Sequence, residues 1–65
     1  MQNTISPEAL FEKIKSFGPF GPQYEVGPVL FPLAENDWMV HITLVGTGET
    51  AQYPWTRILN DPDAA

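Results

Sequence analysis

The sequence predicts a small α+β domain: a meander of three or four antiparallel strands, an N-terminal helix packed on one face and a short C-terminal helix. Three observations carry this prediction. Residues 38–45 alternate as a half-buried strand does, and apolar residues between 10 and 17 recur at helical spacing. The connections are short and rich in glycine and proline, which suits antiparallel neighbours. A chain of 65 residues has room for a single domain.

The N-terminal helix is predicted over residues 6–17. Ser6 can cap free amide groups, Pro7 suits the first helical position, and Glu8 complements the positive end of the helix dipole. Gly18-Pro19 ends the helix, because glycine adopts the left-handed conformation and proline prevents continuation. The apolar residues predicted to share one face are Leu10, Phe11, Ile14 and Phe17.

The segment that follows repeats a Phe-Gly-Pro triplet at residues 17–19 and 20–22. One interpretation is an extended segment that docks into a partner's groove. The other is a connector, residues 18–22, whose two phenyl rings anchor it in the core. We favour the connector, because a core this small needs both rings.

A strand is predicted over residues 24–31, at an edge of the sheet. Gly27-Pro28 interrupts it, and a proline there favours a bulge or an edge position. The break could also separate two strands. A turn at residues 35–37 leads to the strand at 38–45, whose core face is predicted to carry Trp38, Val40, Ile42 and Leu44. The opposite face is half apolar, so we expect a helix or a partner chain to cover part of it.

The rest of the chain continues the meander. Residues 46–48 form a hairpin turn and residues 49–53 the returning strand. Pro54 starts a short helix over residues 55–60, expected at an edge of the sheet. The domain is therefore expected to span residues 1–65, with residues 1–5 and 61–65 frayed.

The composition excludes several classes of function. Eight acidic and three basic side chains give a net charge of −5, which repels nucleic acid. The chain has no cysteine, so we expect no disulfide and no zinc site. No apolar run has membrane-spanning length and the N-terminus does not resemble a secretion signal, so we expect no membrane contact and a cytoplasmic protein.

The sequence also argues against an enzyme. His41 is the single imidazole, and the serines are the cap Ser6 and Ser16 at the helix end, so no catalytic triad can be assembled. The glycines match no phosphate-binding loop. We expect no cofactor and no metal. Glu25 is read as a solvent-facing strand residue rather than a general acid, and Glu35 and Asp37 as turn residues rather than cation ligands.

The candidate contacts for a partner or a ligand are aromatic or polar residues in and beside the strands. Tyr53 and Arg57 lie around the last strand-to-helix junction, and Trp, Tyr and Arg are enriched at binding hot spots. Trp55 at the same junction is read first as a core residue and second as a contact. The full set is Tyr24, His41, Tyr53, Trp55 and Arg57.

The pattern as a whole resembles a family of short bacterial proteins known only as a domain of unknown function. The resemblance rests on Phe17–Gly27, Asp37–Val40, Thr47–Glu49, Tyr53-Pro54 and Ile58–Pro62, and covers nearly all of the chain after residue 16. Because these motifs are turns and core positions, the resemblance implies a shared fold. It implies no catalytic residue.

The favoured function is a non-enzymatic accessory or regulatory module that binds a protein partner or associates with itself as a homodimer. An acidic surface and apolar area left over from a small core support this hypothesis. The alternative is a small-ligand domain with an aromatic pocket around His41. That pocket would be lined by Tyr24, Trp38, His41, Tyr53 and Trp55.

Overall fold

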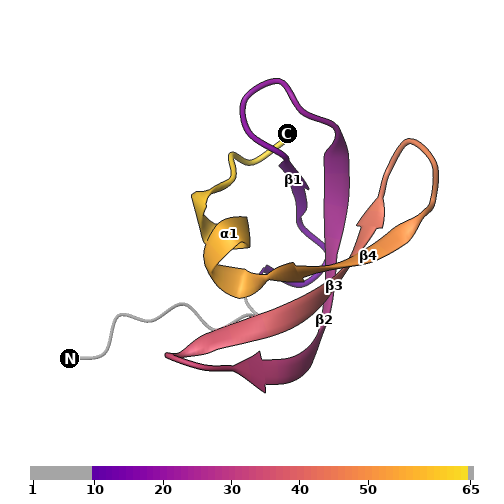
Figure 1. Ribbon diagram of the computed structural model, residues 1–65. Coiled ribbons are helices and arrows are strands. Elements are labelled where there is room, and N and C mark those ends of the chain that lie inside the picture. The colour runs from indigo at the N-terminus through magenta and orange to yellow at the C-terminus, as the bar shows by residue number, and fades with distance from the viewer. Residues whose placement is uncertain (1–9, 65) are drawn as a thin grey trace.

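The computed structural model describes residues 10–64, which form one antiparallel sheet and one helix (Figure 1). The strands lie side by side in chain order, so the predicted meander is confirmed. Within the described residues, no helix has the length and apolar character needed to cross a membrane. The elements are β1 (Ile14–Ser16), β2 (Gln23–Leu33), β3 (Asp37–Leu44), β4 (Thr50–Pro54) and α1 (Trp55–Asn60).

The predicted N-terminal helix is wrong over residues 10–17; residues 6–9 lie outside the described residues. A single turn, closed by the Lys13 N–H donating to the Leu10 carbonyl at 2.9 Å, precedes β1. Glu12 then adopts a left-handed φ of 71°, which a helix cannot continue through. The backbone of β1 instead pairs with β2, with Ile14 opposite Glu25. Strand pairing therefore overrides the helical spacing of the apolar residues.

Two register shifts interrupt the pairing of β2 with β3. Val26 pairs with Ile42 but Val29 pairs with Val40, so Gly27 and Pro28 together oppose one residue. A second shift follows, because Phe31 pairs with Met39. Each shift is a bulge that places one extra residue in β2. The bulge predicted at Gly27-Pro28 is confirmed, and residues 24–31 belong to one strand.

The sequence predicted that β2 lies at an edge of the sheet. This prediction is wrong for the first residues of β2 and holds only for its second half. Its first residues, Gln23–Glu25, lie between β1 and β3. Beyond Val26, the pairing of β2 within residues 10–64 is with β3 alone, so its second half does form an edge of the described sheet. Pro28 and Pro32 lie in this second half, where the N–H that proline lacks is not needed for a second neighbour.

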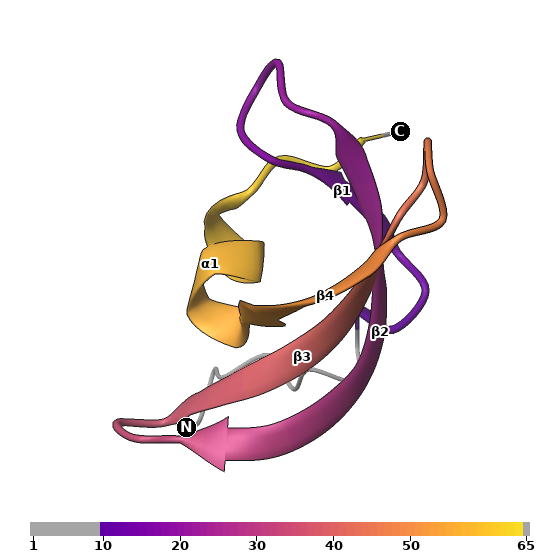
Figure 2. The same cartoon turned by 45° about the vertical axis from the view of Figure 1, so that its right-hand side comes forward.

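The core lies on the concave side of the curved sheet, where α1 packs against β3 and β4 (Figure 2). The predicted helix at residues 55–60 is thus confirmed, but it covers a face of the sheet instead of an edge. The buried hydrophobic residues are Tyr24, Val26, Val40, Ile42, Trp55 and Ile58. Val40 and Ile42 lie on the predicted core face, whereas Trp38 is 37% exposed. The assignment of Trp38 to the core was wrong.

The C-terminal segment, which the sequence predicts to fray, forms backbone hydrogen bonds with β1. The Ser16 N–H donates to Pro62 at 3.0 Å, and the Ala64 N–H donates to Ile14 at 3.0 Å. Between these bonds, the buried Lys15 ammonium lies 3.5 Å from a carboxylate oxygen of Asp63. Residues 62–64 therefore extend the pairing beyond β1. Ala65 lies outside the described residues.

We expect the substitution Gly27→Ala to destabilise the protein. A Cβ at Gly27 would lie 2.7 Å from the carbonyl oxygen of His41, which belongs to the sheet and cannot move aside freely. The free energy of unfolding should fall by about 1–3 kcal/mol, the usual cost of overpacking. Urea unfolding followed by tryptophan fluorescence measures the change.

Gly46→Ala is the matched control, because a Cβ there meets no atom within 4 Å. Equal stability of Gly27→Ala and Gly46→Ala would contradict the close approach of β2 and β3 at the first bulge.

Candidate functional site

Three aromatic rings pack together beside the start of β2, in tilted and edge-to-face arrangements. The ring of Tyr24 lies 4.5 Å from that of Phe17 and 5.6 Å from that of Tyr53. The Tyr24 hydroxyl donates a 2.7 Å hydrogen bond to Asp61, just after α1. Burial and this bond raise the pKa of Tyr24 far above its ordinary value, because both disfavour the phenolate. The cluster connects β2, β4 and the C-terminal segment, which is a structural role.

Tyr24 and Tyr53 lie together, but the five predicted contact residues do not form one accessible site. Tyr24 and Trp55 are buried in the core, so their rings are not accessible to a partner. Tyr53 is half-buried, and burial and the charge of Asp61 raise its pKa. Arg57 is exposed on α1. His41 alternates with Val40 and Ile42 along β3, so it lies on the convex face, opposite the core.

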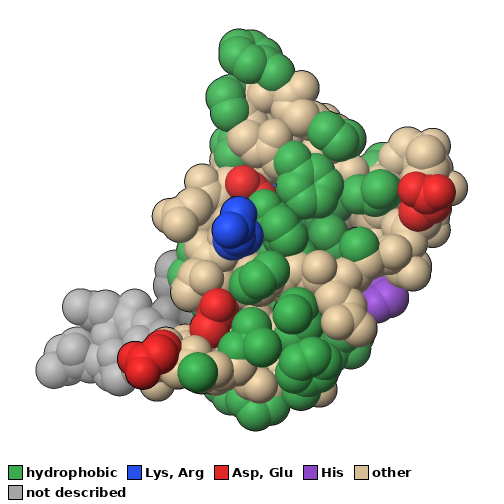
Figure 3. Space-filling model, in the orientation of Figure 1, with side chains coloured by type: hydrophobic (Ala, Val, Ile, Leu, Met, Phe, Trp, Pro, Cys, Tyr) green, Lys and Arg blue, Asp and Glu red, His purple; other side chains and the backbone are tan. Residues whose placement is uncertain are grey.

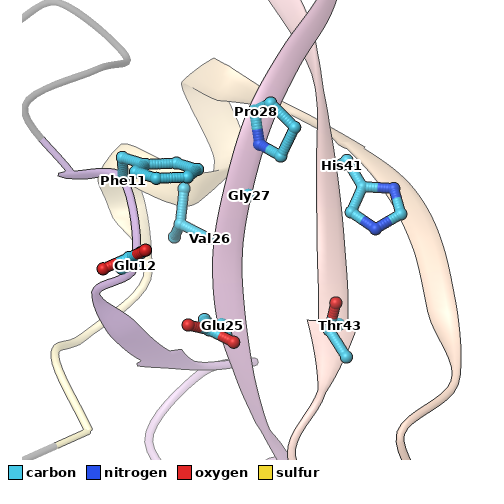
Figure 4. A pocket seen from close by; sticks show the side chains of 8 residues that line it. All are labelled: Phe11, Glu12, Glu25, Val26, Gly27, Pro28, His41 and Thr43. Carbon is cyan, nitrogen blue, oxygen red and sulfur yellow. The ribbon is translucent and has the colours of Figure 1, made fainter.

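The aromatic pocket predicted around His41 is therefore not formed as expected. A shallow hollow of about 200 Å³ does lie beside His41 on the convex face (Figure 4). Its one aromatic wall is Phe11, whereas Tyr24, Tyr53 and Trp55 belong to the core. The hollow is lined by Phe11, Glu12, Glu25, Val26, Gly27, Pro28, His41 and Thr43.

The polar groups of this hollow are separate rather than coupled. His41 and Thr43 point from β3, and Glu25 points from β2 across the same face (Figure 4). Among the side-chain hydrogen bonds of residues 10–64, none joins His41 to Glu25 or Thr43. Those same residues contain no group of three or more His, Cys, Asp or Glu able to hold a metal ion. The hollow can offer hydrogen bonds but holds no oriented nucleophile and base.

Asp37 carries a structural role that the sequence did not predict. Pro54 precedes α1 and provides no side-chain cap. Asp37 supplies it from β3: one carboxylate oxygen accepts from the Thr56 N–H and the other from the Thr56 hydroxyl, both at 3.0 Å. Burial opposes ionisation, but these bonds and one from the Trp38 N–H outweigh it and lower the pKa of Asp37. No local signal reveals a cap 19 residues away.

The two phenyl rings of residues 17–22, hereafter the Phe20 loop, differ in their exposure to solvent. Phe17 packs against the core, as predicted for the connector. Phe20 is 99% exposed, so the prediction that both rings anchor the loop is wrong for Phe20. Glycine at position 21 permits this turn, because a Cβ there would collide with the Phe17 carbonyl.

A second exposed apolar surface lies where β2 and β3 approach their turn. Leu30, Phe31 and Trp38, hereafter the hairpin end, are 41%, 45% and 37% exposed. In Figure 3, hydrophobic side chains gather over this end of the sheet, with acidic side chains beside the turn. The sequence assigned Trp38 to the core and did not single out Leu30 or Phe31. Their exposure depends on the two bulges, whose positions alternation alone does not give.

Comparison with known proteins places the chain among relatives without an assigned function. The model of a family of unknown function, DUF5397, matches residues 2–65. An uncharacterized protein of Haemophilus influenzae (strain ATCC 51907 / DSM 11121 / KW20 / Rd) is similar, with 45% identity over 51 residues. The match covers 78% of this chain and 81% of that protein. These findings confirm the resemblance predicted from the turn and core motifs.

We expect Asp37→Asn to lower the free energy of unfolding at neutral pH by about 0.3–1 kcal/mol, because asparagine keeps an accepting oxygen but loses the negative charge at the helix N-terminus. The folded pKa lies below 3.8, so the contribution of Asp37 is complete above pH 3.8 and is lost as the pH falls through the folded pKa. The stability difference between wild type and variant should therefore shrink below pH 3.8.

Thermal unfolding between pH 7 and pH 2.5 tests this expectation. Glu49→Gln is the control, because Glu49 lies exposed in the turn between β3 and β4. A difference between wild type and Asp37→Asn that stays constant down to pH 2.5 would refute the proposed cap.

Proposed function

We propose that this chain, which belongs to the DUF5397 family of unknown function, acts without catalysis as an accessory or regulatory module that binds a protein partner. The observation that carries the proposal is the exposure of Phe20. Burying a phenyl ring in the core is worth about 1.5–3 kcal/mol. A domain this small has few phenyl rings, and the ring of Phe20 contributes no burial energy to the fold.

The Phe20 loop supports binding because its shape is set by the fold. The Phe17 N–H donates to the Pro22 carbonyl at 3.0 Å and closes the loop. Gly18 takes a left-handed φ of 72°, and Pro19 and Pro22 fix the backbone on either side of Phe20. A partner would therefore bind a ring whose backbone is already ordered, which lowers the entropic cost of association.

The charge of the chain favours a protein pocket over a lipid or nucleic-acid surface. Residues 16–24 contain no charged side chain, and the whole chain carries a net charge of −5. Anionic lipids and phosphate backbones repel such a chain, and no basic residue in the loop compensates. A partner with an apolar pocket for one phenyl ring suits the loop best.

The test is site-specific photo-cross-linking in living cells, with benzoylphenylalanine at position 20. We expect a discrete adduct with one partner protein. Benzoylphenylalanine at position 45 is the matched control, because Val45 is also exposed but lies in a different turn. The adduct should be lost when binding competes with excess unlabelled wild type, and should persist in competition with excess Phe20→Ala.

Phe20→Ala should leave the thermal midpoint unchanged within about 1 °C, since surface substitutions usually alter stability by less than about 0.5 kcal/mol. A large loss of stability would show that Phe20 belongs to the core. Adducts of equal yield at positions 20 and 45 would show that the loop makes no specific contact. Either result contradicts the proposal.

A further inference from the structure

The hairpin end is exposed because the sheet is two strands wide there. β4 reaches only as far as Met39, where it pairs with Pro54, and β1 pairs with the opposite end of β2. Within residues 10–64, Trp38 therefore has a strand beside it only on the side of Pro32, and Pro32 has one only on the side of Trp38. A two-stranded ribbon cannot bury the apolar side chains of both faces. Leu30, Phe31 and Trp38 remain in contact with water.

The hairpin end is nevertheless held in place. Asp37 accepts hydrogen bonds from the Thr56 backbone and hydroxyl, which attach the ribbon to the first turn of α1. In the turn itself, Glu35 and Asn36 both adopt left-handed conformations, with φ of 62° and 65°. These contacts fix the backbone that carries the apolar side chains before any partner binds, which reduces the entropic cost of association.

The charged residues of the hairpin end itself are of one sign. Residues 30–38 include Glu35 and Asp37 but no lysine and no arginine. Glu35 is exposed in the turn, next to the apolar ribbon. From this apolar surface with an acidic rim, we infer that the hairpin end is a second interaction surface, and that it takes a basic amphipathic segment of a partner protein. The apolar side of that segment covers Leu30 and Phe31, which together oppose Met39 on the convex face, and its cations meet the rim.

The same charges disfavour two other occupants. A second copy of the chain would bring two acidic rims together, and each copy carries a net charge of −5. An anionic membrane repels the hairpin end for the same reason. A basic protein segment gains both apolar burial and electrostatic complementarity.

This surface is separate from the Phe20 loop. The loop precedes the first residue of β2, whereas the hairpin end lies in the last part of β2 and the start of β3, and the two lie at opposite ends of the molecule (Figure 1). The longest dimension of the chain is 36 Å. Two partners could occupy the two surfaces at once, so the inference extends the proposed function from a binding module to an adaptor.

The probe is a 14-residue amphipathic peptide made of leucine and lysine, titrated into ¹⁵N-labelled protein. Each backbone amide signal reports on its own residue. We expect saturable shifts of the Leu30 and Phe31 amide signals, while the indole signal of the buried Trp55 stays in place. Phe31→Ser should weaken binding by about tenfold or more, as expected for a central apolar contact. Glu35→Lys should weaken it and reduce its dependence on salt.

Val45→Ser is the matched control and should bind as wild type does, because Val45 is exposed in the turn after β3. Equal affinity for a leucine–glutamate peptide, or a shift of the Leu30 and Phe31 amide signals with vesicles of anionic lipid, would overturn the inference. So would Phe31→Ser binding as tightly as wild type. Phe20→Ala should bind the peptide normally, so failure at the hairpin end and failure at the Phe20 loop remain distinguishable.

Discussion

The pairing of β2 with β3 contains one extra residue at Gly27-Pro28 and another at Leu30, and the shape of the domain follows from these two insertions. A bulge bends its strand and increases the local twist. Figure 2 shows the resulting curvature of β2 and β3, which wraps the sheet around α1. A helix of six residues is then enough to close the concave side, with Trp55 and Ile58 filling the centre.

The insertions also decide which side chains reach water. Without the first bulge, Pro28 would oppose Val40 on the core face; with it, Val29 takes that place. The second bulge moves Phe31 opposite Met39, which shares the convex face with His41, and leaves it exposed. The apolar hairpin end is thus a product of the same register that forms the core. Phe20 is left outside by a different constraint, the turn that only glycine at position 21 permits.

The sequence predicted the features that depend on local chemistry. The turn at 46–48, the helix at 55–60 and the core positions Val40 and Ile42 follow from turn residues and alternation, and Pro28 indicated a bulge. The sequence-based prediction failed where contacts with residues distant in the sequence determine the secondary structure or the burial of a side chain. Residues 14–16 fit a helix by spacing, but β2 and residues 62–64 supply strand hydrogen bonds on both sides. Of the predicted contact residues, Tyr24 and Trp55 are buried in the core. The exposed apolar surfaces lie instead at Phe20 and at the hairpin end.

Cross-strand nuclear Overhauser effects between β2 and β3 test the central claim most directly. The bulged register predicts contacts between the Hα or amide protons of Val26 and Ile42, of Val29 and Val40, and of Phe31 and Met39. An uninterrupted register would instead pair Pro28 with Val40 and Leu30 with Trp38. Observation of that second set would contradict the account, because Leu30 would then face the core side and the hairpin end would not exist as described.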